Sequence, residues 1–143
     1  MFLVAEAPAY DPFGPDEVQC PIRELLARLG GRWSLDVVLA LGSGPRHFGD
    51  LARTIPGVSR RMLALTLRGL ERDGLVARRS EPAPGGKVYY EVTPIGSGLE
   101  EQLKSLGRWS QRNREAIYAA RDAYDRAAPD PLEVALGETP AGL

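Results

Sequence analysis

The chain has 143 residues, of which 43% are hydrophobic and 26% are charged, and its formal net charge is −1. This is the composition of a single globular domain, and no apolar run approaches the roughly 20 residues that span a bilayer. The opening MFLVA lacks the basic flank of a secretory signal, so we expect a cytoplasmic protein without membrane segments.

The positive charge is concentrated in the middle of the chain. Residues 46–92 hold nine Lys and Arg against five Asp and Glu, whereas residues 1–19 hold four acidic residues and no basic one. The tail after Tyr124 is also acidic. Because a local positive field attracts nucleic acid whatever the total charge, this distribution favours a nucleic-acid partner for the central part.

The chain divides into an arm, a folded domain and a tail. Residues 1–19 are acidic, rich in Pro and without periodicity, which predicts a loosely ordered arm. The folded domain is predicted over residues 20–124, beginning with two short helices that end at paired or clustered glycines. Residues 125–143 are predicted to form a flexible acidic tail.

Residues 48–73 carry the pattern of a helix-turn-helix. Two amphipathic helical segments flank Pro56-Gly57, which predicts a tight turn and a steep crossing of the helices. The apolar residues of the second helix share one face, which we expect to pack in the core: Leu63, Leu67 and Leu70.

The other face of the second helix is basic from its first turn. Ser59 stands at the expected N-cap, and Arg60 and Arg61 follow it, where the helix dipole disfavours cations unless an anion binds there. A solvated basic face is the alternative. A DNA phosphate would supply the anion, so we predict that this helix lies in the major groove and that its contacting residues are Ser59, Arg60, Arg61, Ala64, Leu65 and Arg68.

Residues 75–92 predict a β-hairpin. Two runs rich in β-branched and aromatic residues, LVARRS and KVYYEVT, flank EPAPGG, which has the composition of a turn. A hairpin that follows a recognition helix is a wing. Its cations, Arg78, Arg79 and Lys87, are predicted to contact the DNA backbone.

Residues 94–124 predict one long helix. Such a helix would extend about 45 Å, more than a domain of this size can cover, so we expect a second copy to cover its apolar side. A break near Gly107, with the helix folding back, is the alternative. The residues predicted to line this dimer interface, or a ligand pocket within it, are Trp33, Leu99, Leu103, Leu106, Trp109, Ile117 and Tyr118.

Together these elements predict a mainly α fold with a small β-hairpin wing (α+β), a winged helix-turn-helix with helical dimerisation elements from both ends of the chain. From residue 20 to about residue 109 the sequence resembles the HxlR-type family of bacterial winged helix-turn-helix regulators. The matching motifs are CPI (20–22), GGRW (30–33), PGVSRRML (56–63), LRGLERDGLV (67–76) and YYEVTPIG (89–96). The resemblance implies a dimeric DNA-binding repressor or activator. Leu65 departs from the polar residue usual in the family, and an apolar contact with a thymine methyl would fit it.

Cys20 is the only cysteine, so no disulfide within the chain can form. One Cys and one His cannot build a metal cluster, and we expect neither a metal nor a cofactor. At a helix N-terminus the thiolate would be favoured, and the family resemblance places a redox or electrophile sensor at this position. A small buried hydrophobe is the alternative reading.

Other classes of function find less support. His47 is the only histidine, no Gly-x-Ser-x-Gly motif occurs, and PGGK at 84–87 lacks the flanking residues of a phosphate loop, so we do not expect an enzyme. A winged domain used for protein contacts would carry a neutral recognition face. We therefore expect a homodimeric, sequence-specific regulator that binds a palindromic double-stranded DNA operator, acting as a repressor that responds to a redox, electrophile or small-molecule signal.

Overall fold

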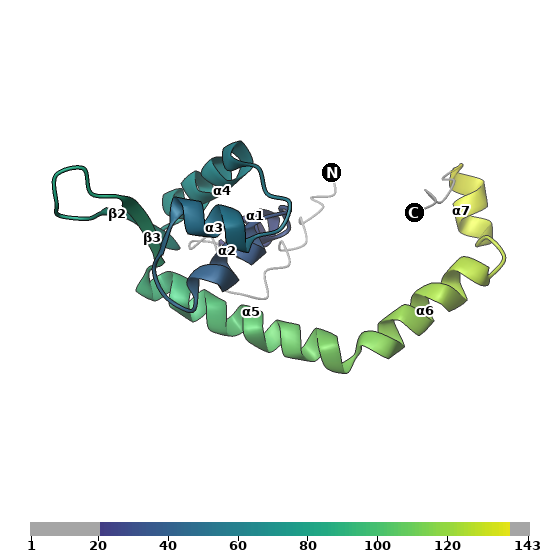
Figure 1. Ribbon diagram of the computed structural model, residues 1–143. Coiled ribbons are helices and arrows are strands. Elements are labelled where there is room, and N and C mark those ends of the chain that lie inside the picture. The colour runs from purple at the N-terminus through teal and green to yellow at the C-terminus, as the bar shows by residue number, and fades with distance from the viewer. Residues whose placement is uncertain (1–20, 138–143) are drawn as a thin grey trace, which may run out of the picture. The chain divides into compact units, whose positions relative to one another are not determined.

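The computed structural model describes residues 21–137, so the predicted arm over 1–19 and the candidate sensor Cys20 lie outside the described residues. The chain divides into two compact units, one up to Glu100 and one from Glu101 onward. Figure 1 shows the elements, which in chain order are α1 (Ile22–Leu29), α2 (Ser34–Leu41), β1 (Arg46–His47), α3 (Phe48–Thr54), α4 (Arg60–Arg72), β2 (Val76–Ser80), β3 (Val88–Val92), α5 (Pro94–Arg112), α6 (Arg114–Arg126) and α7 (Pro131–Leu136).

The predicted hairpin is present, and it belongs to a three-stranded antiparallel sheet in the order β1-β3-β2. In β2 and β3, Val76 pairs with Val92 and Ser80 with Val88. The short strand β1 pairs with the other edge of β3, where His47 lies opposite Tyr89. The wing is therefore joined at its base to the segment that leads into α3.

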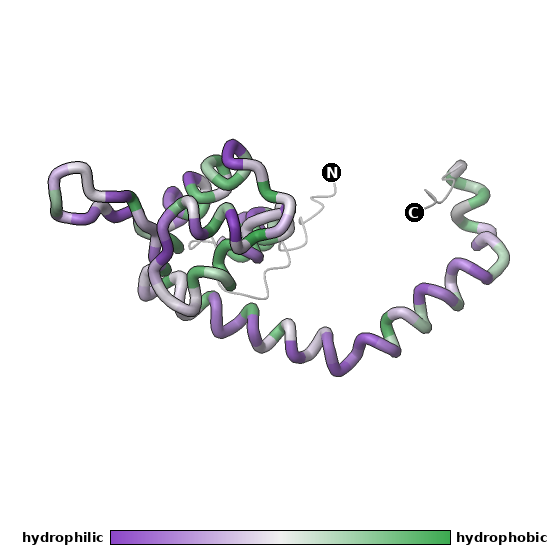
Figure 2. The backbone as a smooth tube through the Cα atoms, viewed as in Figure 1, coloured by the Kyte–Doolittle hydropathy of each residue, from purple (hydrophilic) through white to green (hydrophobic). Residues whose placement is uncertain are grey.

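The core of the first unit lies among α2, α3, α4 and the sheet. The predicted apolar face of α4 is fully buried there, which confirms the helical spacing from which it was inferred. The fully buried side chains are Val37, Val38, Leu41, Leu51, Leu63, Leu67, Leu70 and Val76. Helix α2 supplies three of these side chains, Val37, Val38 and Leu41, because it has neighbours in the core on several sides. Figure 2 shows hydrophobic segments inside this unit.

An ion pair joins α1 to the end of α4. The Nε of Arg28 donates to Oδ2 of Asp73, the C-cap residue of α4, at 2.5 Å. This hydrogen bond raises the pKa of the Arg28 guanidinium, which also lies against Gly69. A cavity of about 540 Å³ is lined there by Glu24, Ala27, Arg28, Arg72 and Asp73.

Thr93 connects the turn after α4 to the start of α5. Its hydroxyl donates to the carbonyl of Gly74 at 2.5 Å and accepts from the backbone N–H of Gly96 at 3.1 Å. Gly96 is buried against the backbone of Leu75, since a Cβ at this position would lie 2.0 Å from the Leu75 carbonyl oxygen. The first turn of α5 therefore packs directly on the turn that follows α4.

The segment from 94 to 124 is not the single helix that the sequence predicts. The structure divides it at Asn113, with α5 ending at Arg112 and α6 beginning at Arg114. The Trp109 carbonyl accepts two hydrogen bonds from Asn113, one from the side-chain amide at 2.8 Å and one from the backbone N–H at 3.1 Å. The alternative break near Gly107 is also absent, because α5 continues through that residue.

The predicted flexible tail contains ordered secondary structure in its described part. Helix α6 runs on to Arg126, and α7 follows, opened by Asp130, whose carboxylate accepts from the N–H of Leu132 at 2.8 Å. Within residues 21–137, no helix is both long and apolar enough to cross a membrane.

Candidate nucleic-acid interface

The start of α4 is built as the sequence predicts. The Ser59 side chain accepts a hydrogen bond from the N–H of Met62 at 3.1 Å, so Ser59 is the N-cap. Gly57 in the preceding turn has a φ of 81°, a conformation that favours glycine. No acidic residue lies in the first turn of α4. The positive end of the helix dipole is therefore not neutralised by a negative side chain of that turn.

The exposed face of α4 holds the residues predicted to contact DNA. Ala64 is half-buried, and the others are exposed: Ser59, Arg60, Arg61, Leu65 and Arg68. Met62 is also exposed, at 43%, close to the 47% of Leu65. Sequence reasoning missed Met62. Its position three residues before Leu65 was the available signal, because residues three apart neighbour one another on a helix.

The arginines of α4 differ in their surroundings. The Arg60 guanidinium lies over the Phe48 ring, 5.1 Å from its centroid. Arg61 and Arg68 form no ion pair or hydrogen bond through their side chains within residues 21–137. All three therefore keep hydrogen-bond donors free for an anionic partner.

The cations of the wing are not equivalent. Arg79 Nε donates to Glu91 Oε1 at 2.9 Å, and this bond raises the pKa of the Arg79 guanidinium. Adjacent residues of a strand point to opposite faces of a sheet, so Arg78 lies on the other face from Arg79. Arg78 and Lys87 form no ion pair within the described chain. Of the three predicted wing contacts, Arg79 is thus the one already engaged.

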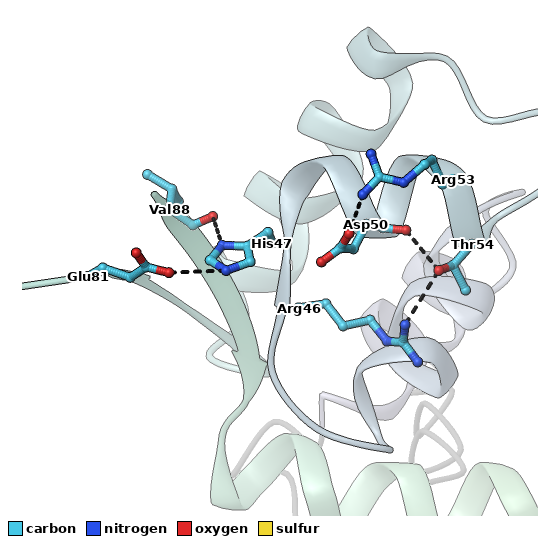
Figure 3. Close-up of polar contacts among 7 residues, drawn as sticks. All are labelled: Arg46, His47, Asp50, Arg53, Thr54, Glu81 and Val88. Atoms are coloured by element: carbon cyan, nitrogen blue, oxygen red, sulfur yellow. Dashed lines mark hydrogen bonds and ion pairs between the residues drawn. The ribbon is translucent and has the colours of Figure 1, made fainter. Parts of the chain in front are cut away.

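Polar contacts at the base of the wing are shown in Figure 3. The Nδ1 of His47 lies 3.3 Å from the Val88 carbonyl oxygen, and its Nε2 lies 3.1 Å from Oε1 of Glu81. The His47 ring also meets Tyr89 edge-on. His47 therefore ties β1 to the β2–β3 hairpin, which is a structural role.

Two further basic residues of the positive region are engaged within the first unit. The Nε of Arg46 donates to the carbonyl of Ala40 at 3.1 Å, and a second nitrogen of Arg46 lies 3.5 Å from the Thr54 hydroxyl. Arg53 pairs with Asp50 on α3 (Figure 3). Within residues 46–92, the basic side chains with neither an ion pair nor a hydrogen bond thus lie on α4 and the wing.

The residues predicted to line a dimer interface or ligand pocket are found in both units. In the first unit, Trp33 and Leu99 are half-buried, and the Arg32 guanidinium lies 4.6 Å from the Trp33 ring. In the second unit, Leu103 and Ile117 are half-buried, whereas Leu106, Trp109 and Tyr118 are each more than half exposed. None of these residues lines the cavity between α1 and the end of α4.

Comparisons with known proteins agree with this geometry. Residues 28–118 match the model of the HxlR-like helix-turn-helix family. The uncharacterized HTH-type transcriptional regulator YtfH of Escherichia coli is 40% identical over 110 residues, which cover 77% of this chain and 86% of that protein.

Solved structures of similar proteins have the same fold. The structure of YtfH from Salmonella typhimurium matches with a TM-score of 0.62 and 36% identity, covering 76% of this chain and 98% of that one. The reduced form of the transcriptional regulator YodB from Bacillus subtilis matches with a TM-score of 0.61 and 31% identity, covering 66% and 94%. YodB has also been solved in a quinone-bound form.

Proposed function

We propose, from the premise that this chain belongs to the HxlR-like helix-turn-helix family, that it acts as a homodimer which binds a specific double-stranded DNA operator through α4. At the coarser level the assignment is direct: the chain is a transcriptional regulator with a helix-turn-helix DNA-binding fold, and not an enzyme. The observation that carries the finer proposal is the exposed face of α4, where three arginines without an ion pair follow a capped helix start.

The proposed contacts fall into two classes. On α4, Arg60, Arg61 and Arg68 would read base edges or flanking phosphates in the major groove, and Leu65 would contact a thymine methyl. On the wing, Arg78 and Lys87 would hold the DNA backbone, which positions the protein without reading sequence. Arg79 would contribute less, because Glu91 already occupies its guanidinium.

The proposal of a dimer is supported by apolar side chains on the C-terminal helices. Three of these side chains are more than half exposed in the single chain: Leu106 (54%), Trp109 (51%) and Tyr118 (51%). Exposed apolar surface is unfavourable in water, and packing against a second copy would bury it. A two-fold dimer would present two copies of α4, so the operator is proposed to be palindromic.

The signal is proposed to be a redox or electrophile change, with repression as the outcome in the absence of the signal. The support is that YodB has been solved in reduced and quinone-bound forms, together with the single thiol of this chain, Cys20. If Cys20 is the sensor, an oxidant or quinone should release the operator from the natural protein and leave the Cys20→Ser variant bound. An effector that releases DNA from both would indicate a ligand site instead.

Selection of bound fragments from a genomic DNA library, followed by titration of the selected site and of random DNA, tests the function. Arg61→Ala should weaken binding to the selected site by about 1–3 kcal/mol and reduce the preference over random DNA. Lys87→Ala should weaken both DNAs alike and flatten the dependence on salt. Arg23→Ala on α1 removes the same charge from a residue outside the proposed DNA contacts and serves as the control.

Two outcomes would contradict the proposal. If the natural protein shows no preference for any fragment over random DNA, the α4 face serves a protein partner, and specific readout is wrong. If Arg61→Ala and Lys87→Ala lower specific and random binding by the same factor, the assignment of readout to α4 is wrong even though DNA is bound.

A further inference from the structure

The Phe48 ring and the Arg60 side chain connect the two helices of the helix-turn-helix at their beginnings. Phe48 is the first residue of α3, and Arg60 is the first residue of α4. The Arg60 guanidinium carbon lies 5.1 Å from the centroid of the Phe48 ring, within the range of about 6 Å over which a cation is attracted to an aromatic face. Phe48 is half-buried, while Arg60 is exposed.

The contact with the Phe48 ring restrains the Arg60 side chain without using its hydrogen-bond donors. An arginine that pairs with a carboxylate, as Arg79 does with Glu91, spends N–H groups on an internal partner. Arg60 forms no side-chain hydrogen bond or ion pair within residues 21–137, so the contact with the ring leaves its N–H groups unused. Arg60 therefore has a preferred position over the Phe48 ring and unused N–H groups, which can form paired hydrogen bonds with guanine or phosphate.

The other arginines of this surface have no such support. Arg61 and Arg68 contact no aromatic ring and no acidic group within residues 21–137. A long, unrestrained side chain loses conformational freedom when it is fixed on DNA, and this loss opposes binding. Of the α4 cations, Arg60 is the one whose orientation the free protein already prepares.

We propose that Phe48 is a positioning residue for DNA readout: it holds the Arg60 guanidinium with its N–H edge directed to the operator, and so contributes to specificity without touching DNA itself. The proposal rests on the proposed function of α4. It predicts that the loss of the Phe48 ring acts through Arg60 and through no other contact.

A double-mutant cycle on the selected operator tests the coupling. Phe48→Leu should weaken operator binding about two- to five-fold and leave binding to random DNA unchanged. In an Arg60→Ala background the same substitution should have no further effect. The conservative change Phe48→Tyr, which keeps an aromatic face, should retain the operator affinity of the natural protein.

The matched control is the same cycle with Arg61→Ala, since Arg61 adjoins Arg60 but does not contact Phe48. In this cycle the fold-losses of operator affinity caused by Phe48→Leu and by Arg61→Ala should multiply, because the two residues act independently. Equal effects of Phe48→Leu in the natural and Arg60→Ala backgrounds would overturn the proposal while leaving the DNA-binding function intact. Failure of the natural protein to prefer any DNA fragment would overturn both.

A measurement on the free natural protein guards against variants that fail to fold. In the NMR spectrum, the side-chain protons of Arg60 should be shifted upfield by the Phe48 ring and show cross-relaxation with its ring protons, while those of Arg61 should resemble an exposed arginine. Arg60 signals at unperturbed positions would overturn the proposal.

Discussion

Glycines two residues apart in α5 have opposite surroundings. Gly96 is buried against the backbone of Leu75, whereas an added Cβ at Gly98 would meet nothing within 4 Å. Both residues lie in the same helix, so their intrinsic helix propensities are the same. The difference in the free energy of unfolding between an alanine substitution at Gly96 and one at Gly98 therefore reports on the close approach of α5 to the turn after α4.

Gly96→Ala should destabilise the protein by about 1–3 kcal/mol, because the new methyl group would clash with the Leu75 carbonyl and backbone has little freedom to move. Gly98→Ala should stabilise it by about 0.5–1 kcal/mol through helix propensity alone. Urea denaturation followed by circular dichroism measures both. Equal effects at the two positions would show that α5 does not pack on Leu75 in this way.

The neighbouring arginines of β2, Arg78 and Arg79, should also differ in their contributions to DNA binding. Arg78→Ala should weaken DNA binding and reduce its salt dependence, because a free cation is lost from the wing. Arg79→Ala should have the smaller effect, since its guanidinium is held by Glu91. Fluorescence anisotropy with labelled DNA at several salt concentrations gives both values. A larger loss for Arg79→Ala would contradict the division of roles within the wing.

The helix α4 combines two demands at its N-terminus. Its stability depends on the hydrogen bond from the Met62 N–H to the Ser59 side chain, whereas its proposed function depends on positive charge in the same turn. Ser59 is neutral, and it satisfies the backbone without adding the negative charge that would best complement the helix dipole. This choice of cap leaves the helix end free for a phosphate.

Substitutions at Ser59 should separate stability from binding. Ser59→Ala should lower the free energy of unfolding by about 1 kcal/mol, because the cap is lost. Ser59→Asp should preserve stability, since Asp is an equally good cap, but it should weaken DNA binding by repelling phosphate. Thermal unfolding and DNA titration of the two variants provide the comparison. Unchanged DNA affinity in Ser59→Asp would place the helix end away from the DNA.

The elements of the first unit could be predicted from local patterns, and the contacts between them could not. The spacing of Leu63, Leu67 and Leu70 specifies which face of α4 is buried, and residues 81–87 have the composition of a hairpin turn. The pairing of Arg79 with Glu91 requires the strand register, and the stacking of Arg60 on Phe48 requires the crossing of two helices. Neither follows from sequence spacing alone.

The break at Asn113 was missed for a different reason. Apolar residues recur at helical spacing on both sides of it, from Trp109 to Ile117, so periodicity predicts a continuous helix. The Asn113 side chain adds a hydrogen bond to the Trp109 carbonyl beside that of its own backbone N–H, and hydrophobic periodicity carries no information about such a local bond.

At the scale of the whole molecule, a single chain leaves large apolar side chains of the second unit exposed to solvent, among them Leu106, Trp109 and Tyr118. Apolar and polar residues alternate along α5 and α6 (Figure 2), as expected for helices that bury one side. The Tyr118 ring is flanked by the guanidinium groups of Arg114 and Arg121, at 5.2 and 5.3 Å. This aromatic group is thus supported by its own helix while it remains half exposed.

If these helices form the homodimer interface, Trp109→Glu should raise the dissociation constant of the dimer at least about 30-fold, because a buried aromatic anchor is replaced by a charge. Gln111→Glu introduces the same charge at an exposed polar position of α5 and should have a much smaller effect. Sedimentation velocity over a concentration series measures the equilibrium. A natural protein that remains monomeric at high concentration would contradict the proposed assembly.

The hydroxyl of Thr93 joins the turn after α4 to the first turn of α5. The start of α5 is consequently fixed to the turn after α4, because one side chain and the closely packed Gly96 connect them. A displacement of the first turn of α5 would therefore reach the turn after α4 directly, instead of being absorbed by a flexible loop.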